Sequence, residues 1–205
     1  AGRIKLLMVH NGGHNFDGFK QVMDPVLSKT GDFEVTVAET FDVLKAENIK
    51  AFDVVLFYGS GGNINEAQEQ GLEGFVNSGG GMVGVHATDA SKKSDVYWRL
   101  IGGRFSGHGG GSFMVRIEDA EHPITKGMED FEISDETYRN KYHPQFHLHS
   151  LVHMDRGDEQ QSMAWLLERM LAKDRRFRHP DWESVRRDIE RVRQGWSPEE
   201  ALDAD

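Results

Sequence analysis

The chain has no cysteine, and this absence removes several kinds of chemistry from consideration. A protein without thiols forms no disulfide, builds no cysteine-based zinc site and has no cysteine nucleophile. Any reaction that its side chains carry out therefore depends on oxygen and nitrogen groups.

The sequence also has few basic residues and no long hydrophobic run. Against 34 Asp and Glu there are 24 Lys and Arg, which leaves a net charge of −10. We expect no nucleic-acid partner, because neutralising phosphates requires a basic surface. The apolar runs have the length of strands, so we expect no membrane-spanning segment and no membrane partner. No signal peptide is recognised after Ala1, which leaves both the cytoplasm and the periplasm open as locations.

The length of 205 residues is typical of one domain with a terminal extension. We place the domain at residues 1–165 and a charged helical extension at residues 166–205. Either this helix is a solvated surface element, or its apolar stripe binds a partner chain and makes a homo-oligomer. The stripe has helical spacing and consists of Trp182, Val185, Ile189, Val192 and Trp196.

Apolar strands alternate with amphipathic helices over the first 90 residues. Short apolar runs at residues 4–9, 33–37, 52–58 and 82–85 predict buried strands. This order favours an α/β fold with a doubly wound, mostly parallel sheet between two layers of helices. The inward-facing residues are expected to be Phe19, Val22, Met23, Val26 and Leu27 in a helix at 16–27, and Leu72, Phe75 and Val76 in a later helix.

The residues that follow the strands are the first candidates for a functional site, because ligands of such sheets bind beyond the carboxyl ends of the strands. These residues are 10–14, 59–63 and 86–89. His86 lies at a strand-to-helix turn, the position where many hydrolases hold their nucleophile. A histidine there can be a general base, a hydrogen-bond donor or a metal ligand, or else a structural residue bonded to the backbone.

Two further histidines are expected near His86. His14 follows the first strand, and His108 ends a glycine-rich segment. Three neutral imidazoles on one rim would suit zinc or a similar divalent metal, although their spacing is unlike a compact zinc motif. The alternative is that His14 is a loop histidine in solvent.

The second half of the chain has a different pattern. We expect a strand at 113–117, a turn at 122–125 and an irregular segment at 134–138 that carries Asp135, Glu136 and Tyr138. Carboxylates there can orient sugar hydroxyls or act as a base, or the segment is instead the start of a helix. The remaining histidines are expected to be scattered over the surface: His143, His147, His149 and His153.

In order and spacing, several blocks of this sequence together resemble the ThuA-like family of trehalose-utilisation proteins, over residues 3 to 165. The resemblance implies a flavodoxin-related, glutamine-amidotransferase-like three-layer fold without the amidotransferase triad. The blocks that carry it are residues 11–14, Tyr58 and the glycines after it, and residues 79–87, 100–108, 122–124 and 135–138.

The resemblance also implies a function in the use of trehalose or a related disaccharide through 3-keto-sugars. The protein is then an isomerase, lyase or hydrolase of keto-sugars, with acid–base or metal-assisted chemistry and no thiol amidotransferase activity. The alternative is a non-catalytic protein that binds sugar or forms a complex. The expected catalytic residues are His86, Glu136 and His14, the sugar contacts are Tyr58, Asp135, Tyr138 and Trp98, and the metal ligands are His108, His86 and His14.

The resemblance ends after residues 164–165. Members of the family usually continue with a Gly-Lys-Gly-Arg-Val strand and a Leu-Gly-His turn, whereas this chain continues with Leu166 and the charged tail. One strand and one histidine-bearing loop of the family pattern are thus missing. The tail helix is a candidate to cover the sheet edge that they would occupy.

Overall fold

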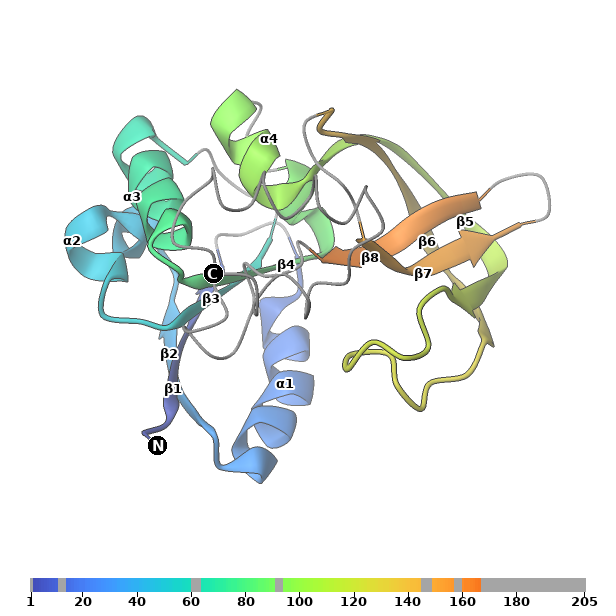
Figure 1. Cartoon of the computed structure of the whole chain (residues 1–205), viewed down its shortest axis with the longest axis horizontal. Helices are drawn as coiled ribbons and strands as arrows, with labels where there is room; N and C mark the ends of the chain where they lie inside the picture. The colour runs from blue at the N-terminus through green and yellow to red at the C-terminus, as the bar shows by residue number, and fades with distance from the viewer. Residues whose placement is uncertain are drawn as a thin grey trace, which may run out of the picture.

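The computed structural model describes residues 2–10, 14–59, 64–90, 94–144, 149–156 and 160–166, the last range by its backbone alone. These residues form two four-stranded sheets (Figure 1). No helix among them is long and apolar enough to cross a membrane. The predicted tail helix, its apolar stripe and the oligomer it was expected to form lie outside the described residues, as does His147.

The first sheet is parallel and has the order β2-β1-β3-β4. The four strands predicted from the apolar runs are therefore confirmed, with small shifts at their ends. The chain passes from β1 to β2 on one side and then crosses to β3 on the other side of β1, so the strand order reverses between β1 and β3. A crevice is expected at the carboxyl ends of these two strands. The strands are β1 (Ile4–His10), β2 (Phe33–Ala38), β3 (Val54–Tyr58) and β4 (Gly81–Val85).

Helices cover both faces of this sheet, as a three-layer fold requires (Figure 1). α1 (Phe16–Thr30) packs on the face formed by Leu6, Met8 and Leu56. The alternate strand residues Leu7, Val9, Val55 and Phe57 point to the opposite face, into the larger core cluster. The elements on that side are η1 (Phe41–Leu44), α2 (Ala46–Ile49), α3 (Glu66–Asn77) and α4 (Asp95–Ile101).

The helix after β1 is confirmed, but its buried face differs in part from the prediction. Val22 is 66% exposed and Val26 is 54% exposed. The stripe that faces the sheet consists instead of Phe16, Phe19, Met23 and Leu27, and the two valines lie beside it. In α3, Leu72, Phe75 and Val76 are buried as predicted.

The second sheet is antiparallel, with the order β6-β5-β7-β8, so the expectation of one mostly parallel sheet is wrong for this half. The predicted strand at 113–117 is only the last part of β5. The segment 134–138 lies within β6 and is neither irregular nor the start of a helix. The strands are β5 (Gly103–Ile117), β6 (Phe131–Tyr142), β7 (His149–Asp155) and β8 (Gln160–Leu166).

Glycine allows the close approach of β5 to β6. Gly109 pairs with Thr137, and a Cβ at that position would lie 3.1 Å from the Thr137 Oγ1 atom. The glycine-rich segment therefore serves as a strand, which its low intrinsic strand propensity did not indicate. The turn at 122–125 is confirmed, and the Asp119 Oδ1 atom accepts hydrogen bonds from the backbone of Glu121 and His122 in it.

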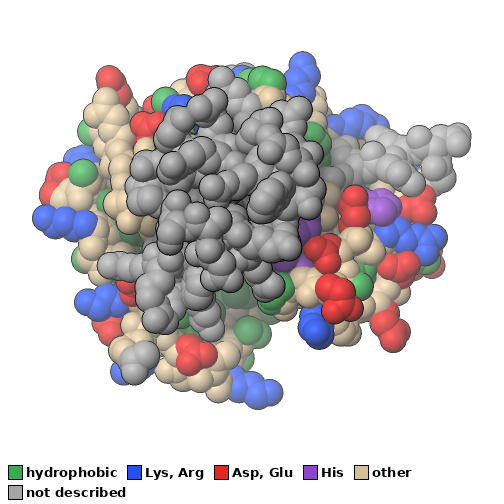
Figure 2. All heavy atoms as spheres, viewed as in Figure 1, with side chains coloured by type: hydrophobic (Ala, Val, Ile, Leu, Met, Phe, Trp, Pro, Cys, Tyr) green, Lys and Arg blue, Asp and Glu red, His purple; other side chains and the backbone are tan. Residues whose placement is uncertain are grey.

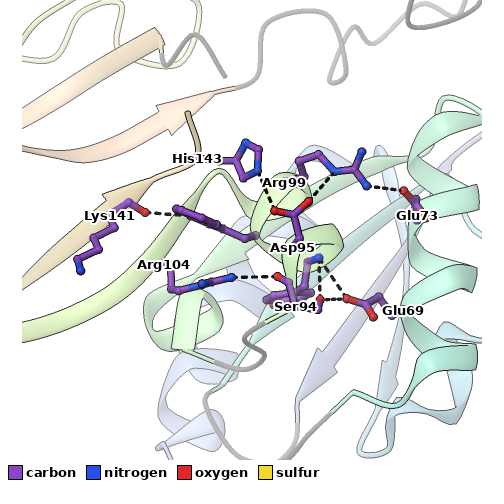
Figure 3. Close-up of polar contacts among 10 residues, drawn as sticks. Glu69, Glu73, Ser94, Asp95, Arg99, Arg104, Lys141 and His143 are labelled. Carbon is purple, nitrogen blue, oxygen red and sulfur yellow. Dashed lines mark hydrogen bonds and ion pairs between the residues drawn. The ribbon is translucent and has the colours of Figure 1, made fainter. Parts of the chain in front are cut away.

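Polar contacts around α4 join the two sheets (Figure 3). Toward α3, the Glu69 carboxylate accepts hydrogen bonds from the Ser94 hydroxyl and from the Tyr97 N–H, and Arg99 pairs with Glu73 at 3.1 Å. Because Glu69 is buried and lies at the N-terminus of α4, it caps this helix and fixes it against α3.

Toward the second sheet, the Trp98 indole N–H donates to the Lys141 carbonyl at 2.9 Å. The His143 Nε2 atom lies 3.3 Å from the Asp95 carboxylate, and the His143 side chain is only 3% exposed. The expectation that this histidine lies on the surface is therefore wrong, because strand pairing places it under α4. His149 and His153 are partly buried and pair with Asp119 and Glu118.

Candidate functional site

His86 occupies a tight turn between β4 and the short helix η2 (His86–Ala90). Its φ of 59° is left-handed, and it is the one residue other than glycine with a positive φ in the described part of the chain. Such a conformation costs on the order of 1–3 kcal/mol, so the surrounding structure must hold it. The predicted strand-to-helix turn at His86 is confirmed.

Buried hydrogen bonds hold this turn. The Thr88 hydroxyl accepts from the Val85 N–H at 3.1 Å and lies 2.9 Å from the Phe57 carbonyl, to which it can donate. The Tyr97 hydroxyl donates to the Thr88 carbonyl at 2.8 Å, and the Tyr97 side chain is fully buried. The strand β3 and the helix α4 thus both determine where His86 lies.

Four aromatic rings, three from β3, η2 and β6 and one from the loop before α1, meet at the carboxyl end of the parallel sheet. The centroids of the His14 and His86 rings are 4.2 Å apart, and the Tyr138 ring lies edge-on to His86 at 5.3 Å. The Tyr58 centroid is 6.3 Å from each of the two histidines. We call His14, Tyr58, His86 and Tyr138 the ring cluster. The structure thus brings together four residues that lie far apart in the sequence.

His108 and Glu136 lie beside the ring cluster on neighbouring strands. The His108 Nδ1 atom is 3.0 Å from the Glu136 carboxylate, and both side chains are exposed. The His108 ring centroid is 6.5 Å from that of Tyr138, its partner residue across the β5–β6 pair. His108 therefore holds the Glu136 carboxylate beside the ring cluster.

Asp135 and Trp98, the other two expected sugar contacts, do not belong to the ring cluster. Asp135 is exposed next to Glu136, and its charge acts on His86. Trp98 lies under the Arg104 guanidinium, which is 4.2 Å from the indole centroid, and its edge meets His143. Among the described ring contacts, none joins Trp98 to the ring cluster.

The electrostatics of the site favour a neutral base and a protonated phenol. Desolvation lowers the pKa of His86, the charge of His14 lowers it further, and Glu136 and Asp135 act in the opposite direction. At neutral pH His86 therefore carries a free nitrogen lone pair. Desolvation raises the pKa of Tyr138, as do the negative charges of Glu136 and Asp89, so its hydroxyl remains a hydrogen-bond donor. On the face shown in Figure 2, histidine side chains lie beside acidic side chains at the right of the view, with basic side chains also nearby.

Asp89 lies among the residues that follow β4, but no pattern in the sequence indicated a role for it. Its side chain is 5% exposed, and burial raises the pKa of its carboxyl to about 6 against the effect of a hydrogen bond from Asn140. Asn140 follows Tyr138 by two residues on β6, so both point to the same face of the strand. Recognising 134–140 as a strand would have revealed this alternation.

The three histidines expected to bind a metal do not fit one as they are arranged. In the described ranges, no group of three or more His, Asp and Glu side chains is placed to hold a metal ion. The rings of His14 and His86 lie against each other, and His108 is turned toward Glu136. Zinc or another divalent metal stays a prediction, and we derive no step through one.

Comparisons with known proteins agree with this architecture. The family model ThuA, described as trehalose utilisation, matches residues 5–179. The fold is similar to that of a ThuA-like protein from Bacteroides uniformis (22% identity, TM-score 0.61, 76% of this chain and 69% of that one). It is also similar to a ThuA-like protein from Parabacteroides merdae (18% identity, TM-score 0.62, 74% of this chain and 68% of that one). A third similar structure is a cytoplasmic protein from Salmonella typhimurium LT2 (12% identity, TM-score 0.51, 75% of this chain and 80% of that one). No curated protein matches the chain.

Proposed function

Because the chain belongs to the ThuA family of trehalose utilisation, we propose that it acts on a sugar or 3-keto-sugar by acid–base chemistry at the ring cluster. The contact of His86 with both His14 and Tyr138 is the observation that carries this proposal. It places a candidate base and two candidate hydrogen-bond donors around one point at the end of the parallel sheet, where ligands of such sheets bind.

The first step of the proposed reaction is the removal of a proton next to the keto group. A carbonyl makes the neighbouring C–H bond acidic, and a base with a pKa near or below neutral can take that proton. His86 fits this role because its lowered pKa keeps it neutral. The C–H bond breaks, the proton moves to the imidazole nitrogen, and the electron pair becomes an enolate on the former carbonyl oxygen.

The enolate oxygen then needs hydrogen-bond donors. The Tyr138 hydroxyl is one candidate, since its raised pKa keeps it protonated, and the His14 ring is the other. For isomerisation, the protonated His86 gives its proton to the former carbonyl carbon, while Glu136, paired with His108, carries the proton of the neighbouring hydroxyl to the enolate oxygen, so the keto group moves by one carbon. For elimination, the carbonyl re-forms, a carbon–carbon double bond forms beside it, and the glycosidic oxygen leaves with the proton from His86. Both outcomes share the same first step.

The test is a His86→Asn variant assayed for turnover of a 3-keto-disaccharide. Asparagine tolerates a left-handed backbone better than alanine does, so the turn can persist without the base. We expect kcat to fall on the order of 100-fold or more, as loss of a general base does, with little change in KM. His122→Ala, in the distant turn, is the control and is expected to keep wild-type kinetics.

A His86→Asn protein with full turnover would exclude His86 as the base. Binding of the keto-sugar without turnover by the wild-type chain would support the alternative of a non-catalytic sugar-binding protein. Isothermal titration calorimetry with the same sugar distinguishes this outcome from an absence of any sugar interaction.

A further inference from the structure

Asp89 has no part in the proposed reaction, yet its surroundings are unusual for a carboxyl group. It lies three residues after His86 in η2 and is 5% exposed. The Asp89 Oδ1 atom is buried without a hydrogen-bond partner among the described residues, and so is the Asn140 Oδ1 atom opposite it on β6. A buried acceptor left unpaired is costly, so such a group in a native structure needs a physical account.

Among the described residues, the groups that hydrogen-bond to the Asp89 carboxyl are neutral: the Asn140 side chain and the backbone N–H groups of Asp89 and Ala90. From β6, Asn140 donates to its carboxyl, and the Tyr138 phenol and Glu136 lie further along the same face. From α4, the Tyr97 hydroxyl is bonded to the carbonyl of the preceding residue. Two basic groups of β5 are bonded elsewhere: Arg104 donates to the Ser94 carbonyl, and His108 pairs with Glu136.

The charge of Asp89 nevertheless reaches the site. When ionised, Asp89 raises the pKa of the Tyr138 hydroxyl, which is the donor offered to the enolate oxygen. A negative charge on Asp89 repels the negative charge that forms when the phenol ionises. It repels a negative charge on a ligand oxygen beside the phenol in the same way.

We propose that Asp89 is a positioning residue that acts on the site through its charge: with a proton on its carboxyl it permits an oxyanion beside Tyr138, and when ionised it opposes one. Burial favours the protonated form of the carboxyl. The raised pKa of about 6 agrees with this and places the change between the two states in a mildly acidic range. The consequence for catalysis rests on the proposed function, whereas the effect of the charge on Tyr138 does not.

The charge effect is tested without substrate, by ¹³C NMR of protein labelled at the tyrosine Cζ carbon. The chain has four tyrosines, and a Tyr138→Phe variant assigns the signal. We expect the Tyr138 signal to show a step near pH 6 in the wild type and none in Asp89→Asn. Asp119→Asn, which alters a carboxyl bonded to His149, is the matched control and should keep the step.

A second variant gives an independent check. The hydrogen bond from Asn140 lowers the pKa of Asp89, so Asn140→Ala is expected to move the step to higher pH. His86 also touches Tyr138 and has a titratable ring, so the proteins with and without Asp89→Asn are compared in a His86→Asn background, which removes the step of His86. In that background, a step near pH 6 that remains with Asp89→Asn, or no step when Asp89 is present, overturns the proposal.

Kinetics provide the link to function. With a 3-keto-disaccharide, the wild-type kcat is expected to fall on the order of tenfold as pH rises through 6, because one nearby negative charge then opposes the oxyanion. The kcat of Asp89→Asn is expected to show no such fall. Equal pH profiles for the two proteins overturn the catalytic part. If the wild type has no turnover, the proposed function fails, while the NMR titration still decides whether Asp89 acts on Tyr138.

Discussion

At the scale of single residues, His86 combines a left-handed backbone with a lowered pKa. The backbone turns the imidazole away from the continuing helix and toward His14 and Tyr138. Their proximity then desolvates the ring and adds the charge of His14. The conformation and the basicity of His86 therefore depend on each other, and a change that relaxes the turn also changes the proton affinity.

The raised pKa of Asp89 implies that the free energy of unfolding depends on pH. Its carboxyl has a pKa of about 6 in the folded protein and an ordinary value of 3.8, so the folded state binds the proton more tightly. Stability from this group is fully present below about pH 4 and is lost as pH rises through 6. The loss above pH 6 is on the order of 3 kcal/mol. Asp89→Asn is therefore expected to raise the free energy of unfolding at pH 7.5.

Urea unfolding of both proteins at pH 7.5 and pH 4 measures this effect. We expect a gain of about 1–3 kcal/mol for Asp89→Asn at pH 7.5 and little difference at pH 4. A difference of the same size at both pH values would contradict the ionisation argument. Asp119→Asn serves again as the control: desolvation raises the pKa of that carboxyl, but hydrogen bonds from His149 and from the backbone outweigh it, so the pKa is lowered in the folded state.

The sequence identified most residues of the site but not the way they interact. His14, Tyr58 and His86 could be predicted because each follows a strand of a recognisable parallel sheet. Asp89 and Asn140 could not, because their interaction depends on β6 lying against η2, which no local pattern encodes. Trp98 has the right chemistry for a sugar contact, but its packing against Arg104 and Lys141 appears only in the folded structure.

At the scale of elements, α3 contains two glycines in very different surroundings. A Cβ at Gly71 would lie 2.1 Å from the Leu44 carbonyl oxygen and 2.6 Å from the Ala46 nitrogen, which are backbone atoms. A Cβ at Gly74 would meet nothing within 4 Å. At Gly71, α3 therefore lies directly against the backbone of the η1–α2 connection, and a residue with a Cβ would clash with that backbone.

Two alanine substitutions in this helix should have opposite effects. Gly71→Ala is expected to destabilise the protein by about 1–3 kcal/mol, because the connection must move away. Gly74→Ala is expected to stabilise it by about 0.5–1 kcal/mol, because alanine is the better helix former. Chemical denaturation of both variants measures these changes. If the two substitutions had the same effect, the close packing of α3 at Gly71 would be wrong.

The elements of the first half could be predicted and those of the second half only in part. Parallel strands buried on both faces carry a continuous apolar signal of their own. β5 and β6 carry none, because glycines fill the middle of β5 and polar residues fill β6. Their stability comes from pairing between segments that are distant in sequence, so the pattern of either segment alone indicated a loop or the start of a helix.

At the scale of the whole molecule, several contacts cross between the sheets: Trp98 to Lys141, His143 to Asp95, and Asp89 to Asn140. We therefore expect the two halves to unfold together. Native-state hydrogen exchange should give peptides from β4 and from β6 the same free energy of opening. Much faster exchange of the β6 peptides would show that the antiparallel half opens by itself.

The ring cluster is divided between the two halves. The parallel half supplies His86, and the antiparallel hairpin supplies Tyr138 and its acidic neighbours. Each part can therefore diverge separately during evolution: exchanging residues of the hairpin alters which molecules are accepted while the imidazole that takes the proton stays in place. An engineer seeking a new selectivity would accordingly randomise β6 and leave the turn at His86 untouched.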